Sequence, residues 1–256
     1  EGVTSIGNFA FSGCSRLKSI SLPSTLSELG DSDYPEVFNN CYNLEEIKVA
    51  EGNTTYDSRN NCNAIIQEKQ GITHLVYACK GTTIPEGVQI IDNDPFCACG
   101  PAELNIPSTV EAINSNYRYG LVRITVAEGN KTYDSRNDCN AIIETAKNEL
   151  IWGCINTVIP DGVERLGKGA FAGVYDLETI NLPESVTSIG KDCFLSTKLF
   201  LGQPYGIVYL GKHAIGYKID YENPMTENSI LTIKEGTEYI SDYAFMQWPG
   251  SVVLPS

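Results

Sequence analysis

The chain contains 256 residues, with 18 Lys and Arg against 32 Asp and Glu, which gives a formal net charge of −14 at pH 7. A hydrophobic share of 42% and a charged share of 20% are typical of a folded globular protein and exclude an intrinsically disordered chain. The acidic charge disfavours nucleic acid and anionic membranes as partners, and no apolar run approaches the ~20 residues of a transmembrane segment.

A repeated pattern defines the first predicted elements along the chain. Each copy has an apolar residue, usually with a proline after it, and two further apolar residues at fixed spacing. The copies run from Leu22 to Leu29, Ile84 to Ile91, Ile106 to Ile113, Ile159 to Leu166 and Leu182 to Ile189, with a variant without proline from Ile233 to Ile240. Such a pattern is typical of repeat architectures, in which each repeat buries its apolar face against its neighbours.

A small or apolar residue followed by phenylalanine comes after most copies of the pattern. The pairs are Ala10-Phe11, Val37-Phe38, Pro95-Phe96, Ala170-Phe171, Cys193-Phe194 and Ala244-Phe245. Six of the eight phenylalanines occupy this position. We therefore expect their rings to stack from repeat to repeat, and we name this row of rings the aromatic spine.

A short strand is predicted after the phenylalanine, for example at Leu17–Leu22, Leu44–Val49 and Leu177–Leu182. Apolar and polar residues alternate in these segments, so one face points inward and the other points to solvent. Solenoids use such arrayed strand residues as extended binding surfaces. We name the candidate partner-binding residues the outward strand face: Ser19, Ser21, Glu46, Lys48, Glu103, Asn105, Arg123, Thr125, Thr179 and Asn181.

The combined pattern L-x-x-I-x-L-P-x-x-V-x-x-I-G-x-x-A-F-x-x-C resembles the BspA-like (Treponema pallidum-type) leucine-rich repeats over most of the chain. The resemblance implies a leucine-rich repeat solenoid, β-rich with short helical segments, wound as a right-handed β/α superhelix. It also implies a bacterial cell-surface or secreted protein. We expect a single domain over residues 1–256. Because the pattern is cut at both ends, we expect this domain to be a fragment of a longer protein.

Two segments are near-copies of each other. Ala50–Ile66 reads AEGNTTYDSRNNCNAII and Ala127–Ile143 reads AEGNKTYDSRNDCNAII. Each leads into a second apolar strand, so each predicts an inserted β-hairpin, and a third, divergent hairpin is predicted with strands near Gly206–Leu210 and His213–Lys218. The three insertions cover about residues 50–83, 127–158 and 203–232.

The hairpin register places two pairs of cysteines opposite each other. Pairing Thr145 with Asn148 sets Cys139 against Cys154, and the same register sets Cys62 against Cys79 around a turn that is longer by two residues. Two interpretations remain open for these cysteines. They are disulfides, as in extracellular proteins, or buried free thiols. The recurrence of Cys14, Cys41 and Cys99 after phenylalanine favours a buried ladder at that position.

No metal or cofactor is predicted. Cys97-Ala98-Cys99 lacks the further ligands of a zinc site. Asp57–Asn61 and its twin Asp134–Asp138 invite a calcium-loop interpretation, but they lack the spacing and the closing Glu of an EF-hand loop. Asp and Asn also cap tight turns, and we favour that interpretation.

No enzymatic activity is predicted, because neither His74 nor His213 has an evident Ser or Cys partner in the repeat pattern. The leading hypothesis is an extracellular or cell-surface protein-binding module, and the resemblance implies adhesion to host matrix proteins or to other cell-surface proteins. One alternative is a structural spacer that projects another domain. Another is a glycan-binding module, with Tyr117, Tyr119, Trp152 and Trp248 as candidate aromatic anchors.

Overall fold

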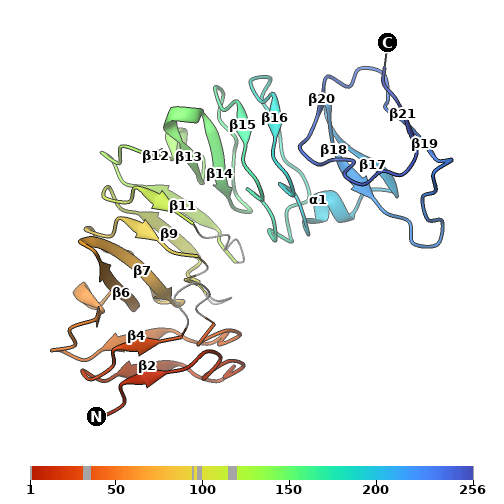
Figure 1. Ribbon diagram of the computed structural model, residues 1–256. Coiled ribbons are helices and arrows are strands. Elements are labelled where there is room, and N and C mark those ends of the chain that lie inside the picture. Colours follow the sequence, from red (N-terminus) through yellow and green to blue (C-terminus); the bar gives the residue numbers. More distant parts are fainter. Residues whose placement is uncertain (1, 31–35, 94, 97–99, 115–119, 256) are drawn as a thin grey trace. The chain divides into compact units, whose positions relative to one another are not determined.

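The structure is a computed structural model that describes residues 2–30, 36–93, 95–96, 100–114 and 120–255. The chain divides into two compact units, Glu1–Ser135 and Arg136–Ser256. Both units consist of short strands joined by turns, and the described residues contain one short α-helix (Figure 1). The prediction that strand content exceeds helix content is therefore confirmed.

The strands of the first unit are β1 (Ser5–Ile6), β2 (Ser19–Leu22), β3 (Glu28–Leu29), β4 (Glu46–Val49), β5 (Tyr56–Asp57), β6 (Ala64–Lys69), β7 (Ile72–Ala78), β8 (Ile90–Ile91), β9 (Glu103–Ile106), β10 (Ala112–Ile113), β11 (Arg123–Val126) and β12 (Tyr133–Asp134). The elements of the second unit are β13 (Ala141–Glu144), β14 (Glu149–Gly153), β15 (Arg165–Leu166), β16 (Ser188–Ile189), α1 (Lys198–Leu201), β17 (Gly206–Leu210), β18 (His213–Lys218), β19 (Ile230–Thr232), β20 (Tyr239–Ile240) and β21 (Ser251–Val253).

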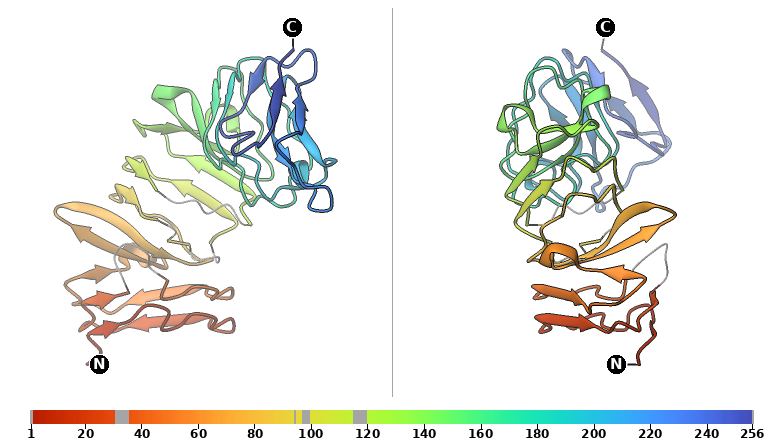
Figure 2. Two further views of the ribbon diagram at one scale, coloured as in Figure 1. Left: turned by 45° about the vertical axis from the view of Figure 1, so that its right-hand side comes forward. Right: turned by 90° about the vertical axis from the view of Figure 1, so that its left-hand side faces the viewer.

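The regular repeats contain longer and shorter strands, and these strands pair in parallel with their counterparts in a neighbouring repeat. The longer strands form the pairs β2–β4, β9–β11 and β19–β21. The shorter strands form the pairs β1–β3, β8–β10 and β15–β16. Figure 2 shows β2 and β4 side by side at the red end of the chain. In the pair β1–β3 Ser5 lies opposite Glu28, and in the pair β15–β16 Arg165 lies opposite Ser188, so the stacked residues of these repeats are 23 positions apart in the sequence.

The aromatic spine forms within both units. The rings of Phe11 and Phe38 stack with centroids 5.7 Å apart and an interplanar angle of 11°. The rings of Phe171 and Phe194 do the same at 5.4 Å and 11°. In the first hairpin Tyr77 continues the row, edge-on to Phe38 at 5.2 Å. The predicted stacking is thus confirmed for these phenylalanines, and the first hairpin adds the ring of Tyr77.

All three predicted hairpins are present, as the antiparallel pairs β6–β7, β13–β14 and β17–β18. The third has the strand bounds that the sequence predicts. In each hairpin the second strand also pairs in parallel with the short strand of the following repeat: β7 with β8, β14 with β15 and β18 with β20. The hairpins are therefore built into the stack of short strands.

An asparagine fastens each of the two near-identical insertions to the preceding repeat. Asn53 Nδ2 donates to the carbonyls of Pro23 and Leu26, at 3.0 and 2.8 Å. Asn130 Nδ2 donates in the same way to Pro107 and Val110, at 2.8 and 3.0 Å. The duplicated sequence thus encodes a duplicated contact with the repeat before it.

The predicted cysteine register is wrong, because each hairpin contains a β-bulge. Near the turn of the second hairpin Ile143 lies opposite Leu150, as predicted, but beyond the bulge Ile142 lies opposite Trp152. The extra residue shifts the pairing by one position, so the register no longer sets Cys139 against Cys154.

The turn of the first hairpin also differs from the prediction. The two additional residues lengthen the ladder rather than the turn, because Lys69 pairs with Ile72 around Gln70-Gly71 alone. Both turn residues have positive φ, 54° and 81°, which suits a tight turn between two strands.

The strand predicted at Leu177–Leu182 is not formed. Its neighbour on one side is α1 instead of another strand: Lys198 N donates to Tyr175 O at 2.8 Å and Leu199 N donates to Leu177 O at 2.7 Å. A helical turn cannot provide the evenly spaced donors and acceptors of a parallel ladder. The segment therefore keeps its alternating exposure but has no strand partner there.

Candidate functional site

The outward strand face lies at the surface, as predicted. Eight of its ten residues are exposed, and the other two, Glu46 and Thr125, are half-buried. Parallel pairing sets Ser19 beside Glu46 and Ser21 beside Lys48 on β2 and β4. Thr179 and Asn181 are exposed as well, but they stand outside any strand.

A second group of the same face lies on β9 and β11. There Glu103 pairs with Arg123 and Asn105 with Thr125, and Thr125 Oγ1 donates to Asn105 Oδ1 at 3.1 Å. Both groups belong to the first unit. They present alternating acidic, basic and neutral side chains, an arrangement suited to polar contacts with a protein segment.

The acidic segment at Asp57 forms a tight turn. Asp57 Oδ1 accepts hydrogen bonds from Arg59 N at 2.9 Å and from Arg59 Nε at 2.8 Å. Burial acts to raise the pKa of this carboxyl, but the hydrogen bonds and charge of Arg59 outweigh it and hold the pKa below its usual value. Ser58 Oγ accepts from Val49 N at 2.9 Å. The favoured turn interpretation is therefore confirmed for this segment.

The four hairpin cysteines are buried free thiols in this structure. Cys79 Sγ donates to Asn63 O at 3.1 Å, and Cys154 Sγ donates to Asn140 O at 3.4 Å. Burial raises the pKa of Cys62 to about 11 and also raises that of Cys79. Thiols with raised pKa values are poor nucleophiles at neutral pH, so these side chains act as small apolar groups.

The two histidines have structural partners. His74 Nδ1 lies 2.7 Å from Asp92 Oδ1, and Lys69 Nζ lies 3.0 Å from the other oxygen of the same carboxylate. His213 is buried, stacks on Tyr239 at 4.7 Å and contacts Val186 O through Nε2 at 3.1 Å. Burial lowers the pKa of His213.

Some sequence-based candidates fall in segments that the structure does not describe. Within the described ranges no cluster of three or more His, Cys, Asp or Glu side chains could hold a metal ion. Cys97, Cys99, Tyr117 and Tyr119 lie outside the described residues. Among the residues that the structure does describe, no helix combines the length and the apolar character needed to cross a membrane.

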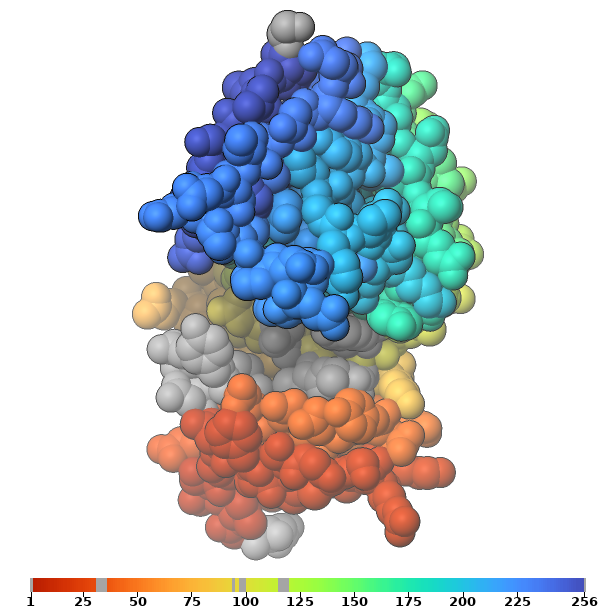
Figure 3. Space-filling view, turned by 90° about the vertical axis from the view of Figure 1, so that its right-hand side faces the viewer, coloured from red at the N-terminus to blue at the C-terminus, as the bar shows by residue number. Residues whose placement is uncertain are grey.

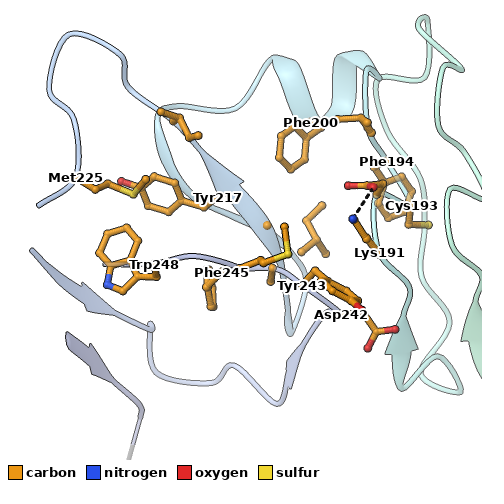
Figure 4. A pocket seen from close by; sticks show the side chains of 17 residues that line it. Lys191, Cys193, Phe194, Phe200, Tyr217, Met225, Asp242, Tyr243, Phe245 and Trp248 are labelled. Atoms are coloured by element: carbon orange, nitrogen blue, oxygen red, sulfur yellow. Dashed lines mark ion pairs between the residues drawn. The ribbon is translucent and has the colours of Figure 1, made fainter. Parts of the chain in front are cut away.

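The second unit contains a pocket of about 350 Å³ that the sequence analysis missed (Figure 4). It lies between the repeat that carries Phe194, the helix α1, the strand β18 and the segment from Asp242 to Trp248. Tyr217 and Trp248 meet on one side with ring centroids 5.1 Å apart. Lys191, Asp192 and Asp242 are its charged residues. An apolar pocket with a few charged groups is the usual form of a ligand site.

Of the sequence-predicted aromatic anchors, one lines this pocket and one is excluded. Trp248 lies half-buried in the pocket, and its Nε1 donates to Ser251 O at 3.2 Å. Trp152 has 0% of its surface exposed. The expectation that Trp152 could anchor a glycan is therefore wrong, because packing in the second hairpin claims its ring.

The hairpin registers explain where the pocket comes from. Tyr77 lies opposite Ile65 just beyond the bulge of the first hairpin, and Trp152 lies opposite Ile142 at the same place in the second. In the third hairpin that place is taken by Gly216, opposite Val208. When the three hairpins are aligned by their bulges, the third lacks the aromatic ring that the other two carry at this place.

Comparison with solved structures gives likenesses to bacterial leucine-rich repeat proteins. A leucine-rich repeat protein from Eubacterium ventriosum is 17% identical with a TM-score of 0.50, covering 94% of this chain and 62% of that one. A leucine-rich cell surface protein from Faecalibacterium prausnitzii is 24% identical with a TM-score of 0.48, covering 77% and 49%. This chain thus spans less than two thirds of either structure. A search of the curated proteins gives no match.

The repeat pattern itself matches a family model. Six copies of the BspA-type leucine-rich repeat region are found over residues 1–68, 76–138 and 151–201, which is most of the chain. The match agrees with the stacked parallel strands and with the spine of phenylalanine rings described above. The chain therefore has a leucine-rich repeat fold and belongs to the family of BspA-type leucine-rich repeat proteins.

Proposed function

We propose that this chain is a non-enzymatic protein-binding module of a bacterial cell-surface or secreted protein, and that it contacts its partner through the outward strand face. The observation that carries the proposal is the exposure of this face on paired strands, where Ser21 adjoins Lys48 and Glu103 adjoins Arg123. Repeat proteins commonly bind through such arrayed strand residues.

The location and the partner class form the second part of the proposal. A similar structure is described as a cell surface protein, and family membership makes the same location reasonable for this chain. The proposed ligand of this chain is a protein of the host matrix or of another cell surface, so the chain would act as an adhesin-like module.

The architecture forms the third part. We propose that residues 1–256 form a single domain, a solenoid wound as a right-handed β/α superhelix, with the three hairpins as inserted modules. The parallel pairing of successive repeats within each unit supports this. Each repeat would then depend on its neighbours for the burial of its apolar face.

The proposal is tested by measuring binding of the full chain to immobilised extracellular matrix proteins and to a glycan panel. The double substitution Lys48→Glu and Arg123→Glu reverses two charges on the outward strand face. It should weaken binding to the protein ligand by about tenfold or more, because charge-reversed contacts repel the partner.

A matched control reverses two charges elsewhere on the same unit. Lys80 and Lys131 are exposed and stand outside the outward strand face, so Lys80→Glu with Lys131→Glu changes the net charge equally. Binding should then change by no more than about twofold. Equal losses in both double variants, or the absence of any protein that responds to Lys48→Glu and Arg123→Glu, would contradict the proposal.

A further inference from the structure

The aromatic spine is interrupted in the third hairpin. Gly216 stands where the first two hairpins carry Tyr77 and Trp152. Phe200 of α1 approaches this position from the side: a Cβ atom on Gly216 would lie 2.9 Å from Phe200 Cε2. The ring of Phe200 thus takes the space next to Gly216, and the pocket opens beside it, lined by Phe200 and Phe245 (Figure 4).

The repeat that follows the third hairpin does not close this gap. In the first two hairpins the amide after the aromatic ring bonds to the next repeat, Ala78 N to Pro95 O at 2.7 Å and Gly153 N to Ala170 O at 2.9 Å. No corresponding bond joins Tyr217 N to Ala244 O, although both residues are described. Phe245, whose counterparts stack in the spine, lines the pocket and is only half-buried.

The rim of the pocket is unusually apolar for exposed surface. Leu195, Tyr243 and Met246 line it with 49%, 63% and 56% of their surface exposed. They belong to the surface of the second unit, whose C-terminal residues are blue in Figure 3. Clustered exposed apolar side chains around a pocket indicate an interaction site. The flexible side chains of Met225 and Met246 can adapt to an incoming group.

The charged side chains at the pocket favour a ligand that carries a basic group next to its apolar group. Lys191 is already engaged, 3.9 Å from Asp192 and over the ring of Tyr243 at 4.9 Å. Asp242 is exposed and has no ion-pair partner among the described side chains. Together with the net charge of −14, this leaves a carboxylate available to a cation.

We propose that this pocket binds an aromatic side chain of a partner protein, flanked by a basic residue that pairs with Asp242. The ring inserts into the pocket beside Phe200 and Phe245. This proposal rests on the proposed protein-binding function and adds a second contact site in the second unit. A sugar fits less well, since Trp248 is packed against Tyr217 and Tyr243 is covered by Lys191 on one face.

The test uses the full chain and three N-acetylated tripeptide amides as probes, lysyl-tryptophyl-lysine, lysyl-alanyl-lysine and glutamyl-tryptophyl-glutamate, observed by ligand-detected NMR. The first should bind about tenfold more tightly than the second, because only it buries an aromatic ring. The first probe should also bind more tightly than the third, because the first presents cations to Asp242 and the third presents carboxylates.

Substitutions separate the pocket from the rest of the surface. Tyr243→Ala and Met246→Lys should each weaken binding of the lysyl-tryptophyl-lysine probe about tenfold, and Asp242→Asn should weaken it severalfold. The matched controls are Tyr175→Ala and Asp161→Asn. Tyr175 is also exposed and also lies under a lysine, Lys198 at 5.6 Å, but it does not line the pocket. Both controls should leave affinity within about twofold.

Other results would overturn the proposal. Equal binding of the tryptophan and alanine probes would exclude a ring site. Binding of N-acetylglucosamine or methyl mannoside that is lost in Tyr243→Ala, without peptide binding, would make it a sugar site. A dimer in light scattering that Met246→Lys dissociates would make it a self-association surface.

Failure of this inference is distinguishable from failure of the proposed function. If the tripeptides do not bind but a matrix protein still responds to Lys48→Glu and Arg123→Glu, only the pocket proposal falls. If neither the face variants nor the pocket variants alter binding of any protein, both proposals fall.

Discussion

At the scale of single residues, stability depends on rings and thiols that no solvent reaches. Phe38 and Phe171 are 1% and 0% exposed, and each stacks on the ring of another repeat. Gly153 lies so close to Phe171 that a Cβ atom there would fall 2.2 Å from the ring. Hairpin and repeat are thus packed together without spare space around this phenylalanine.

Replacing Phe171 by alanine should therefore lower the free energy of unfolding by about 3–5 kcal/mol, through lost burial and a cavity. Urea titration followed by circular dichroism measures the change. Phe9→Ala is the control, since Phe9 is 54% exposed, and it should shift stability by no more than about 0.5 kcal/mol. Equal midpoints for Phe171→Ala and the unsubstituted chain would argue against the aromatic spine.

The buried thiols predict how stability responds to alkali. Burial raises the pKa of Cys62 from 9.0 to about 11, so above pH 9 the unfolded state ionises while the folded state keeps its proton. The folded state then binds more protons, and stability falls as pH rises from 9 towards 11. Below pH 9 this thiol has no effect on the pH dependence.

Urea titrations on either side of pH 9 measure this slope. Cys62→Ala removes the group and should flatten the decline, although Cys79 and Cys154 contribute in the same direction. A decline that is unaltered in Cys62→Ala would show that this thiol ionises alike in both states, or that it is not a free thiol.

At the scale of elements, the sequence predicts most of what repetition encodes. The three hairpins and the strands of the outward face follow from alternating apolar residues and from near-identical segments. The bulges do not, because the one extra residue, Ile151 in β14, leaves the apolar character of the segment unchanged. The cysteine pairing failed for that reason.

The strand at Leu177–Leu182 failed for a different reason. Its own alternation favours a strand, but a strand also needs a partner, and its neighbour α1 is a helical turn. Thr197 caps the start of that turn, because its side-chain oxygen accepts a hydrogen bond from Phe200 N. This cap lies outside Leu177–Leu182, so the alternation within the segment could not predict it. The sequence analysis missed the pocket for a similar reason. Gly216 points to a missing ring only when it is compared with Tyr77 and Trp152 at the equivalent positions of the other hairpins.

At the scale of the whole molecule, the question is whether the chain unfolds as one. The hydrophobic core of the first unit includes Leu22 and Phe38, and that of the second includes Phe171 and Phe194. In stacked repeats, stability is the sum of weak single repeats and favourable contacts between neighbours. A single domain should therefore lose both cores together.

The two tryptophans make this testable, because Trp152 and Trp248 both belong to the second unit. Tryptophan fluorescence in urea therefore reports the second unit alone, whereas far-ultraviolet circular dichroism reports both. For a single cooperative domain the two transitions should coincide.

Phe38→Ala, a substitution in the first unit, should then lower the fluorescence midpoint along with the dichroism midpoint. Phe9→Ala, at an exposed position of the same unit, should move neither. A Phe38→Ala chain whose fluorescence midpoint is unchanged while its dichroism splits into two steps would mean that the units fold independently, because loss of a ring in one core would then carry no cost for the other.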